Sequence, residues 1–195
     1  MNHGLAIQSA LAYGATLALS LRLHRDGSAD TWLRQPVSAY ANGPQARLFM
    51  TYGLVGIVAA GLLAAAMAGR GFPRLAVVCL AAMAALRIGV FALRTGDGTA
   101  ARAAGSRVHL ALAVVTFTLA CQAVSSGTPR AGELVPSLAP LFRGLAWIAA
   151  LSLAGVVATG VIPALRRWFG LAERLFLGAT LAWFVLLAAG LASVP

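Results

Sequence analysis

Charged residues are scarce in this chain of 195 residues: they make up 10% of it, and lysine is absent altogether. Hydrophobic residues make up 60%. So few polar side chains cannot cover the surface of a water-soluble protein of this length. The composition therefore excludes an ordinary soluble domain and indicates an integral membrane protein.

Acidic residues are scarcer still, with five of them against fifteen arginines and a net charge of +10. In a soluble chain this excess would suggest nucleic-acid binding. Here the arginines stand at the ends of apolar runs, without the interleaved aromatics of a nucleic-acid surface, which is typical of membrane anchoring and contact with anionic lipid. We therefore expect membrane lipid as a partner, and no nucleic acid.

Metal-ligating residues are also few. Cys79 and Cys121 lie inside apolar runs, and two cysteines alone cannot form a thiolate zinc or iron–sulfur site. The three histidines do not fall on one side of the predicted membrane, which argues against a zinc site of three histidines. With no nucleotide-binding loop and no Gly-x-Ser-x-Gly motif, we expect no metal and no cofactor, and the sequence leaves open whether the chain is an enzyme.

Six apolar runs are each long enough to cross a hydrocarbon core of about 30 Å. Short linkers with breakers such as Asn42-Gly43-Pro44, Gly71-Phe72-Pro73 and Thr128-Pro129 separate them. The sequence predicts an all-α fold, a single polytopic bundle of six transmembrane helices with antiparallel sequential neighbours. The predicted spans are 4–23, 48–69, 75–93, 108–126, 145–165 and 175–194.

The distribution of arginine predicts the orientation. Ten arginines flank the first, third and fifth linkers, whereas four flank the second and fourth. Because arginine accumulates in cytoplasmic loops, we expect the odd linkers in the cytoplasm and both termini outside.

Arg87 is the most conspicuous charge inside a predicted span. It lies seven residues before Arg94, on the same helix face, and no acid occurs within a span to neutralise it. Three interpretations stay open: Arg87 reaches the interface by extending its side chain, it makes a structural hydrogen bond, or it binds a ligand.

Other polar residues gather near the odd linkers. Asp97 lies in the third linker and His109 begins the fourth span, and the two could serve as an acid and base pair, although His109 could instead be an interfacial residue that caps the bundle. Glu173 and Arg174 adjoin and point about 100° apart on a helix, so we expect each to serve a different neighbour. The candidate ligand-binding residues are Ser38, Tyr40, Arg47, Arg87, Glu173 and Arg174, and the weaker catalytic candidates are Asp97 and His109.

Three ordered motifs accompany the six-span layout. They are Val37-Ser38-Ala39-Tyr40 leading to Gly43-Pro44, Leu48-Phe49 and Gly53; Asp97 followed by His109; and Gly170-Leu171-Ala172-Glu173-Arg174-Leu175 with Trp183 downstream. In these features most of the chain resembles a bacterial membrane family called domain of unknown function 998. The resemblance implies the six-span fold, a bacterial cytoplasmic (inner) membrane and the grouping of polar residues, and it supplies no reaction.

The leading functional hypothesis is that the odd-side polar residues bind an anionic lipid headgroup or small amphiphile. For this we expect Arg47, His109 and Glu173 to converge at one end of the bundle, since all three begin helices on the same side. The alternatives are an accessory subunit with a membrane-protein partner, a lipid-modifying enzyme that uses Asp97 and His109, and a small transporter. Transport is disfavoured because no span carries a helix-breaking pair at its middle.

Overall fold

The computed structural model describes residues 2–25, 29–92 and 100–193, and the elements found there are all helical. Six helices are long, and four short helical segments join them: α2 (Ala29–Arg34), η1 (Val37–Asn42), η2 (Pro136–Leu138) and η3 (Pro163–Trp168). The long helices are α1 (Asn2–His24), α3 (Ala46–Ala68), α4 (Arg74–Ala92), α5 (Ala100–Leu134), α6 (Ala139–Val161) and α7 (Phe169–Ser193).

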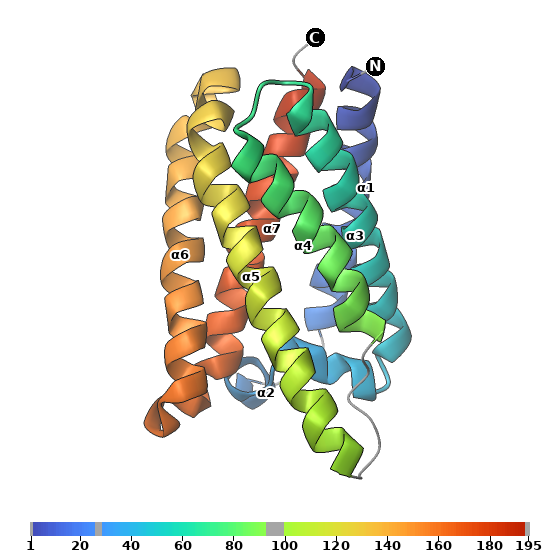
Figure 1. Ribbon diagram of the computed structural model, residues 1–195, viewed down its shortest axis with the longest axis vertical. Helices are drawn as coiled ribbons and strands as arrows, with labels where there is room; N and C mark the ends of the chain where they lie inside the picture. Colours follow the sequence, from blue (N-terminus) through green and yellow to red (C-terminus); the bar gives the residue numbers. More distant parts are fainter. Residues whose placement is uncertain (1, 26–28, 93–99, 194–195) are drawn as a thin grey trace.

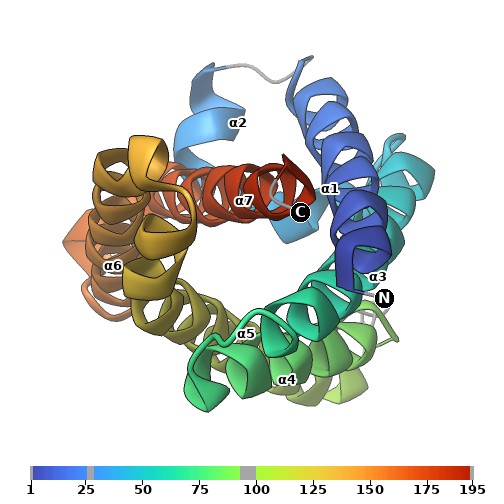
Figure 2. The ribbon, with the colours of Figure 1, turned by 90° about the horizontal axis from the view of Figure 1, so that it is seen from above.

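The long helices form a closed ring in which each packs on the next along the chain and α7 returns to pack on α1 (Figure 2). Besides its neighbours α6 and α1, the helix α7 also contacts α5 and α3, because it lies toward the middle of the ring (Figure 2). It is the most buried of the six long helices. In Figure 1 both ends of the chain lie at the top, while α2 and the α6–α7 connection lie at the bottom. We call the bottom, which carries α2, η1 and η3, the odd-linker end.

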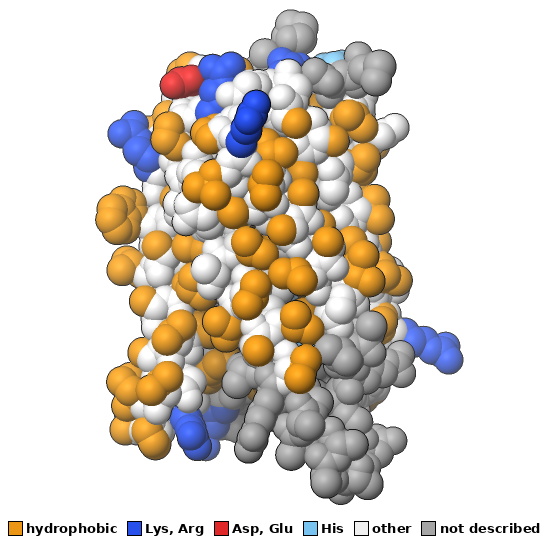
Figure 3. Space-filling view, viewed as in Figure 1, with side chains coloured by type: hydrophobic (Ala, Val, Ile, Leu, Met, Phe, Trp, Pro, Cys, Tyr) orange, Lys and Arg blue, Asp and Glu red, His pale blue; other side chains and the backbone are white. Residues whose placement is uncertain are grey.

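Each of the six long helices is long and apolar enough to cross a membrane. Large apolar side chains such as Leu11, Trp147 and Leu151 are more than two-thirds exposed on the outside of the ring. On the face seen in Figure 3, hydrophobic side chains cover the middle and charged ones gather toward the two ends. Lipid tails are the natural solvent for such a surface, and the predicted bundle of six transmembrane helices is confirmed.

The helix α5 runs further than the sequence predicts. The expected break at Thr128-Pro129 is wrong, because Pro129 lies inside α5, which continues to Leu134. Proline is tolerated in membrane helices where neighbours compensate the freed backbone groups. Here Thr128 lies in the packed core, where its hydroxyl accepts a hydrogen bond of 3.1 Å from the indole N–H of the fully buried Trp183.

At the opposite end the α3–α4 turn does contain the predicted break. Gly71 adopts a φ of +72°, which favours glycine. The guanidinium of Arg130 donates two hydrogen bonds of 3.1 Å to the carbonyl oxygen of Arg70 and another of 2.8 Å to Glu133. This turn and the end of α5 are thereby tied together.

Candidate functional site

Two adjacent residues near the start of α7 hold the α2–η1 segment against the bundle. The buried carboxylate of Glu173 accepts a hydrogen bond of 2.7 Å from the backbone N–H of Val37. The buried Arg174 Nη1 donates to the carbonyl oxygens of Trp32 (3.1 Å), Gln35 (2.7 Å) and Gly170 (3.1 Å). Each therefore binds a different part of the segment, and we call Glu173, Arg174 and residues 32–37 the clasp.

Aromatic rings surround the guanidinium of the clasp. Its central carbon lies 5.7 Å from the ring centroid of Trp32 and 6.0 Å from that of Tyr40, within the range of cation–π attraction. The ring of His24 packs edge-on against both aromatics, at centroid distances of 5.5 and 5.6 Å. Trp32 and Tyr40 thus pack around Arg174.

Gly170 makes the clasp sterically feasible. A Cβ atom there would lie 2.6 Å from the carbonyl oxygen of Gln35 and 2.8 Å from both the carbonyl oxygen of Trp32 and Arg174 Nη1. Two of these atoms belong to the backbone, so the contact could not be relieved by rotating a side chain. The close approach of α7 to residues 32–35 therefore requires a glycine at the start of the Gly170–Leu175 motif.

A cavity of about 460 Å³ lies beneath the clasp, inside the odd-linker half of the ring. Its volume falls in the range of about 300–1,000 Å³ typical of small-molecule sites. Its walls are mostly apolar, and they include Phe49, Val90, Phe91, Val114, Phe117 and Leu177. Its polar lining consists of Ser38 and Asn42 from η1, Tyr52, Arg87, His109, Thr116 and Glu173.

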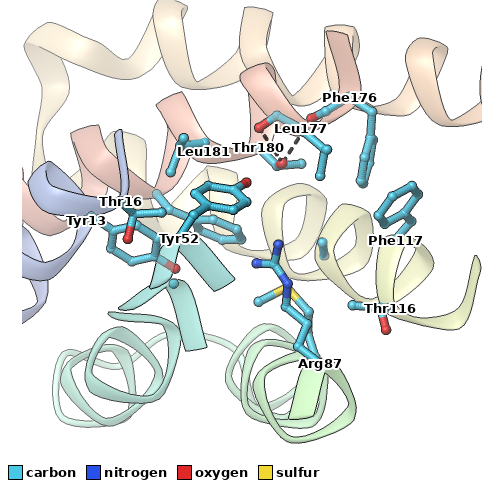
Figure 4. Close-up of a pocket in the computed structure, with 14 residues that line it drawn as sticks. Tyr13, Thr16, Tyr52, Arg87, Thr116, Phe117, Phe176, Leu177, Thr180 and Leu181 are labelled. Atoms are coloured by element: carbon cyan, nitrogen blue, oxygen red, sulfur yellow. Dashed lines mark hydrogen bonds between the residues drawn. The ribbon is translucent and has the colours of Figure 1, made fainter. Parts of the chain in front are cut away.

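Arg87 reaches from α4 into the interior of the ring (Figure 4). It lines both the large cavity and a smaller one of about 30 Å³ further from the odd-linker end. It makes no hydrogen bond or ion pair with another residue in the part of the chain that the structure describes. Arg87 therefore faces the interior of the ring and makes no structural hydrogen bond to a described residue.

The structure brings some of the predicted residues together and separates others. Ser38, Arg87, His109 and Glu173 line the large cavity, and His109 Nδ1 is buried without a hydrogen-bond partner among the described residues. Arg174 belongs to the neighbouring clasp, and the ring of Tyr40 lies against its guanidinium. Arg47 is exposed at the start of α3, at the same odd-linker end as His109 and Glu173, but it lines none of the described cavities, so a site shared by these three residues stays a prediction. Asp97 lies outside the described residues.

Two tyrosines that line these cavities were not predicted as site residues from the sequence. Tyr13, on α1, lines the smaller cavity, and Tyr52, on α3, lines both. A signal was available, because tyrosine in a membrane helix prefers the interface and Tyr13 lies near the middle of its span. As for metals, the described residues contain no group of three His, Cys, Asp or Glu side chains that could hold an ion.

These features define a class: a polytopic helical membrane protein whose ring of helices contains a mostly apolar cavity, lined by an arginine that pairs with none of the described residues. The family described as "Protein of unknown function (DUF998)" matches residues 9–190, and the chain belongs to that family. The resemblance drawn from the motifs is thereby confirmed. No curated protein and no solved structure matches the chain.

Proposed function

We propose that this protein binds an amphiphile that carries a single negative charge, with the charge beside Arg87 and the apolar portion in the large cavity. One observation carries the proposal: Arg87 faces a cavity of about 460 Å³ without a hydrogen bond or ion pair to any described residue. A guanidinium at membrane depth is costly unless an anion, water or polar group accompanies it. An anionic ligand supplies that partner.

The walls of the cavity suit a hydrocarbon chain. Three phenylalanines, Phe49, Phe91 and Phe117, line it together with aliphatic side chains. Phe49 and Phe91 pack with ring centroids 5.3 Å apart, as do Phe117 and Phe176 at 4.8 Å. An apolar chain that enters the cavity from water gains about 0.8 kcal/mol for each methylene buried, whereas one that enters from the bilayer gains no such free energy.

The clasp gives this cavity a cover. Pro36, Val37, Ser38, Ala39 and Asn42 line the cavity at its odd-linker end, and Glu173 and Arg174 bind the segment that contains them. In this proposal the odd linkers face the cytoplasm of a bacterial cell, so the cover lies at the cytoplasmic leaflet. The ten arginines flanking the odd linkers support that orientation.

The other predicted roles draw less support. The exposed apolar side chains that an accessory subunit would offer to a partner lie where lipid would cover them in any case. For a lipid-modifying enzyme, His109 lines the cavity, whereas Asp97 lies outside the described residues. The residues of the large cavity therefore support amphiphile binding better than either of these roles.

The test measures binding of dodecanoate, and of the neutral dodecanol, to the purified protein in lipid nanodiscs by equilibrium dialysis. Arg87→Gln removes the charge in the cavity, and Arg47→Gln removes an exposed charge at the same end. We expect saturable binding of dodecanoate that Arg87→Gln weakens roughly 10- to 100-fold, the range for losing a charge-assisted hydrogen bond. Arg47→Gln and the binding of dodecanol should change little.

Two results would reject the proposal. One is saturable dodecanoate binding that is equally strong in the wild type and in Arg87→Gln. The other is a loss of binding in Arg47→Gln with Arg87→Gln unaffected, which would restore the site expected from the sequence. A thermal unfolding curve for each variant shows whether it has folded.

A further inference from the structure

The smaller cavity forms a continuation of the large one toward the middle of the bundle. It has a volume of about 30 Å³ and lies between α1, α3, α4, α5 and α7. Both cavities are lined by Tyr52, Arg87, Thr116, Phe117 and Leu177, so they meet at Arg87. Because a water molecule needs about 10–15 Å³ of such space, the smaller cavity has room for roughly two water-sized groups.

Hydrogen-bond donors are concentrated there. The side chain of Tyr13 is 3% exposed, its hydroxyl has no partner among the described residues, and it points toward the space that the Arg87 guanidinium enters (Figure 4). The hydroxyls of Thr16 and Thr180, by contrast, already donate to carbonyl oxygens of their own helices. Tyr13 is therefore a buried donor without an acceptor, whereas buried donors normally have one, and the half-buried Arg87 beside it has no hydrogen bond or ion pair to a described residue.

Charge and size together restrict what can satisfy these donors. Arg87 contributes one positive charge, which a monoanion balances. A carboxylate has two oxygens and one substituent, and it matches a space for two water-sized groups with an open side toward the large cavity. A phosphodiester has the same charge, but its phosphorus carries four oxygens, two of them bearing substituents, and this group is too large for a space of about 30 Å³.

We infer that the smaller cavity holds the carboxylate group of a single-chain amphiphile, with its oxygens accepting hydrogen bonds from Arg87 and Tyr13. The inference deepens the proposed function and rests on it, since it names the class of amphiphile. The apolar chain then extends through the large cavity toward η1.

In this placement the ligand has the opposite orientation to a lipid in the adjacent leaflet. Tyr13 lies eleven residues from each end of α1, whereas η1 lies at the odd-linker end. The carboxylate would therefore sit near the middle of the membrane and the chain nearer the surface. The ligand is bound as a separate molecule inside the protein, and not as a lipid that keeps its head in the interface.

A substitution at a glycine can test the smaller cavity without removing a polar group. A Cβ atom at Gly56 would lie 3.5 Å from the Thr16 methyl carbon and 3.8 Å from Arg87 Nη1, both ordinary contacts. Gly56→Ala therefore fits without strain and takes space from the smaller cavity. Gly61, on the same helix, has nothing within 4 Å of such an atom, so Gly61→Ala is the matched control.

The experiment compares dodecanoate with dodecyl methyl phosphate, a single-chain phosphodiester of the same charge, in nanodiscs. The wild type should prefer dodecanoate by about tenfold or more, and Tyr13→Phe should reduce that affinity about 2- to 10-fold, as expected for one neutral hydrogen bond. Gly56→Ala should weaken dodecanoate binding severalfold, and Gly61→Ala should not. Unfolding curves that match the wild type show that Tyr13→Phe and Gly56→Ala have folded.

The outcomes separate this inference from the proposed function. If both anions bind equally well and depend on Arg87, while Tyr13→Phe and Gly56→Ala have no effect, the proposed function stands and the carboxylate site is rejected. If neither anion depends on Arg87, the proposed function itself is rejected.

Discussion

Removing the guanidinium of the clasp should release the α2–η1 segment. Arg174→Met keeps an apolar stem of similar length but deletes the hydrogen bonds to the carbonyl oxygens of Trp32 and Gln35. Each hydrogen bond from a charged donor contributes about 1.5–3 kcal/mol. At the lower bound, losing both lowers the free energy of local opening by about 3 kcal/mol, which raises the open population roughly a hundredfold.

The rate of trypsin cleavage after Arg34 measures this opening. Arg34 lies between the two carbonyl groups that Arg174 binds, so cleavage after Arg34 requires the segment to leave its place. When opening is fast relative to cleavage, the cleavage rate follows the open population. We expect Arg174→Met in nanodiscs to be cleaved there about a hundredfold faster than the wild type, with cleavage after Arg70, at the opposite end, as the internal reference.

Two variants complete the design. Arg174→Lys keeps the charge but loses the planar group that lies over Trp32 and Tyr40, so we expect an intermediate, roughly tenfold increase in cleavage. Arg166→Gln removes an exposed arginine at the same end and should leave the rate unchanged. Rates for Arg174→Met within about threefold of the wild type would refute the reasoning, because a hundredfold effect could not be hidden there.

Three further predictions concern single contacts and the orientation. Gly170→Ala should destabilise the protein by about 1–3 kcal/mol in thermal unfolding because its Cβ would overlap the clasp backbone, whereas Gly178→Ala, with nothing within 4 Å, should unfold as the wild type does. Thr128→Val leaves the indole N–H of Trp183 without its acceptor and should cost about 1 kcal/mol, while Thr128→Ser should restore most of the loss; equal stability of Val and Ser variants would contradict this role. In intact cells, an impermeant maleimide should label a cysteine placed in η2 and not one placed in η3, and the reverse pattern would invert the predicted orientation.

The architecture was predictable because hydrocarbon sets a strict length for its helices. Six apolar runs in 195 residues leave little chain for anything else, and the ring contains one helix for each run. The end of α5 was not predictable in the same way. Pro129 marks a helix end in water, whereas in this bundle the helix continues through it, beside the buried pair of Thr128 and Trp183.

The site was predictable only in part. Adjacent residues on a helix point in different directions, and Glu173 and Arg174 do bind different parts of the chain. The choice between Arg47 and Arg87 could not be made from the sequence. In a soluble helix the apolar stripe identifies the inner face, but in a membrane helix the outer face is equally apolar, so the pattern around Arg87 does not say which way it points.

Closure of the ring by α7 has a consequence for how the protein is made. Synthesis runs from α1 to α7, yet α1 packs on α3 and on α7, and both the clasp and the cavity walls use residues of α7. Until the final helix has entered the bilayer, the earlier five can form only an open arc, with one flank of α1 unmatched. The contacts between α1 and α7 join residues that are far apart in the sequence, and such contacts form slowly. A nascent chain that stops short of α7 therefore lacks the contact between the first and last helices that closes the ring.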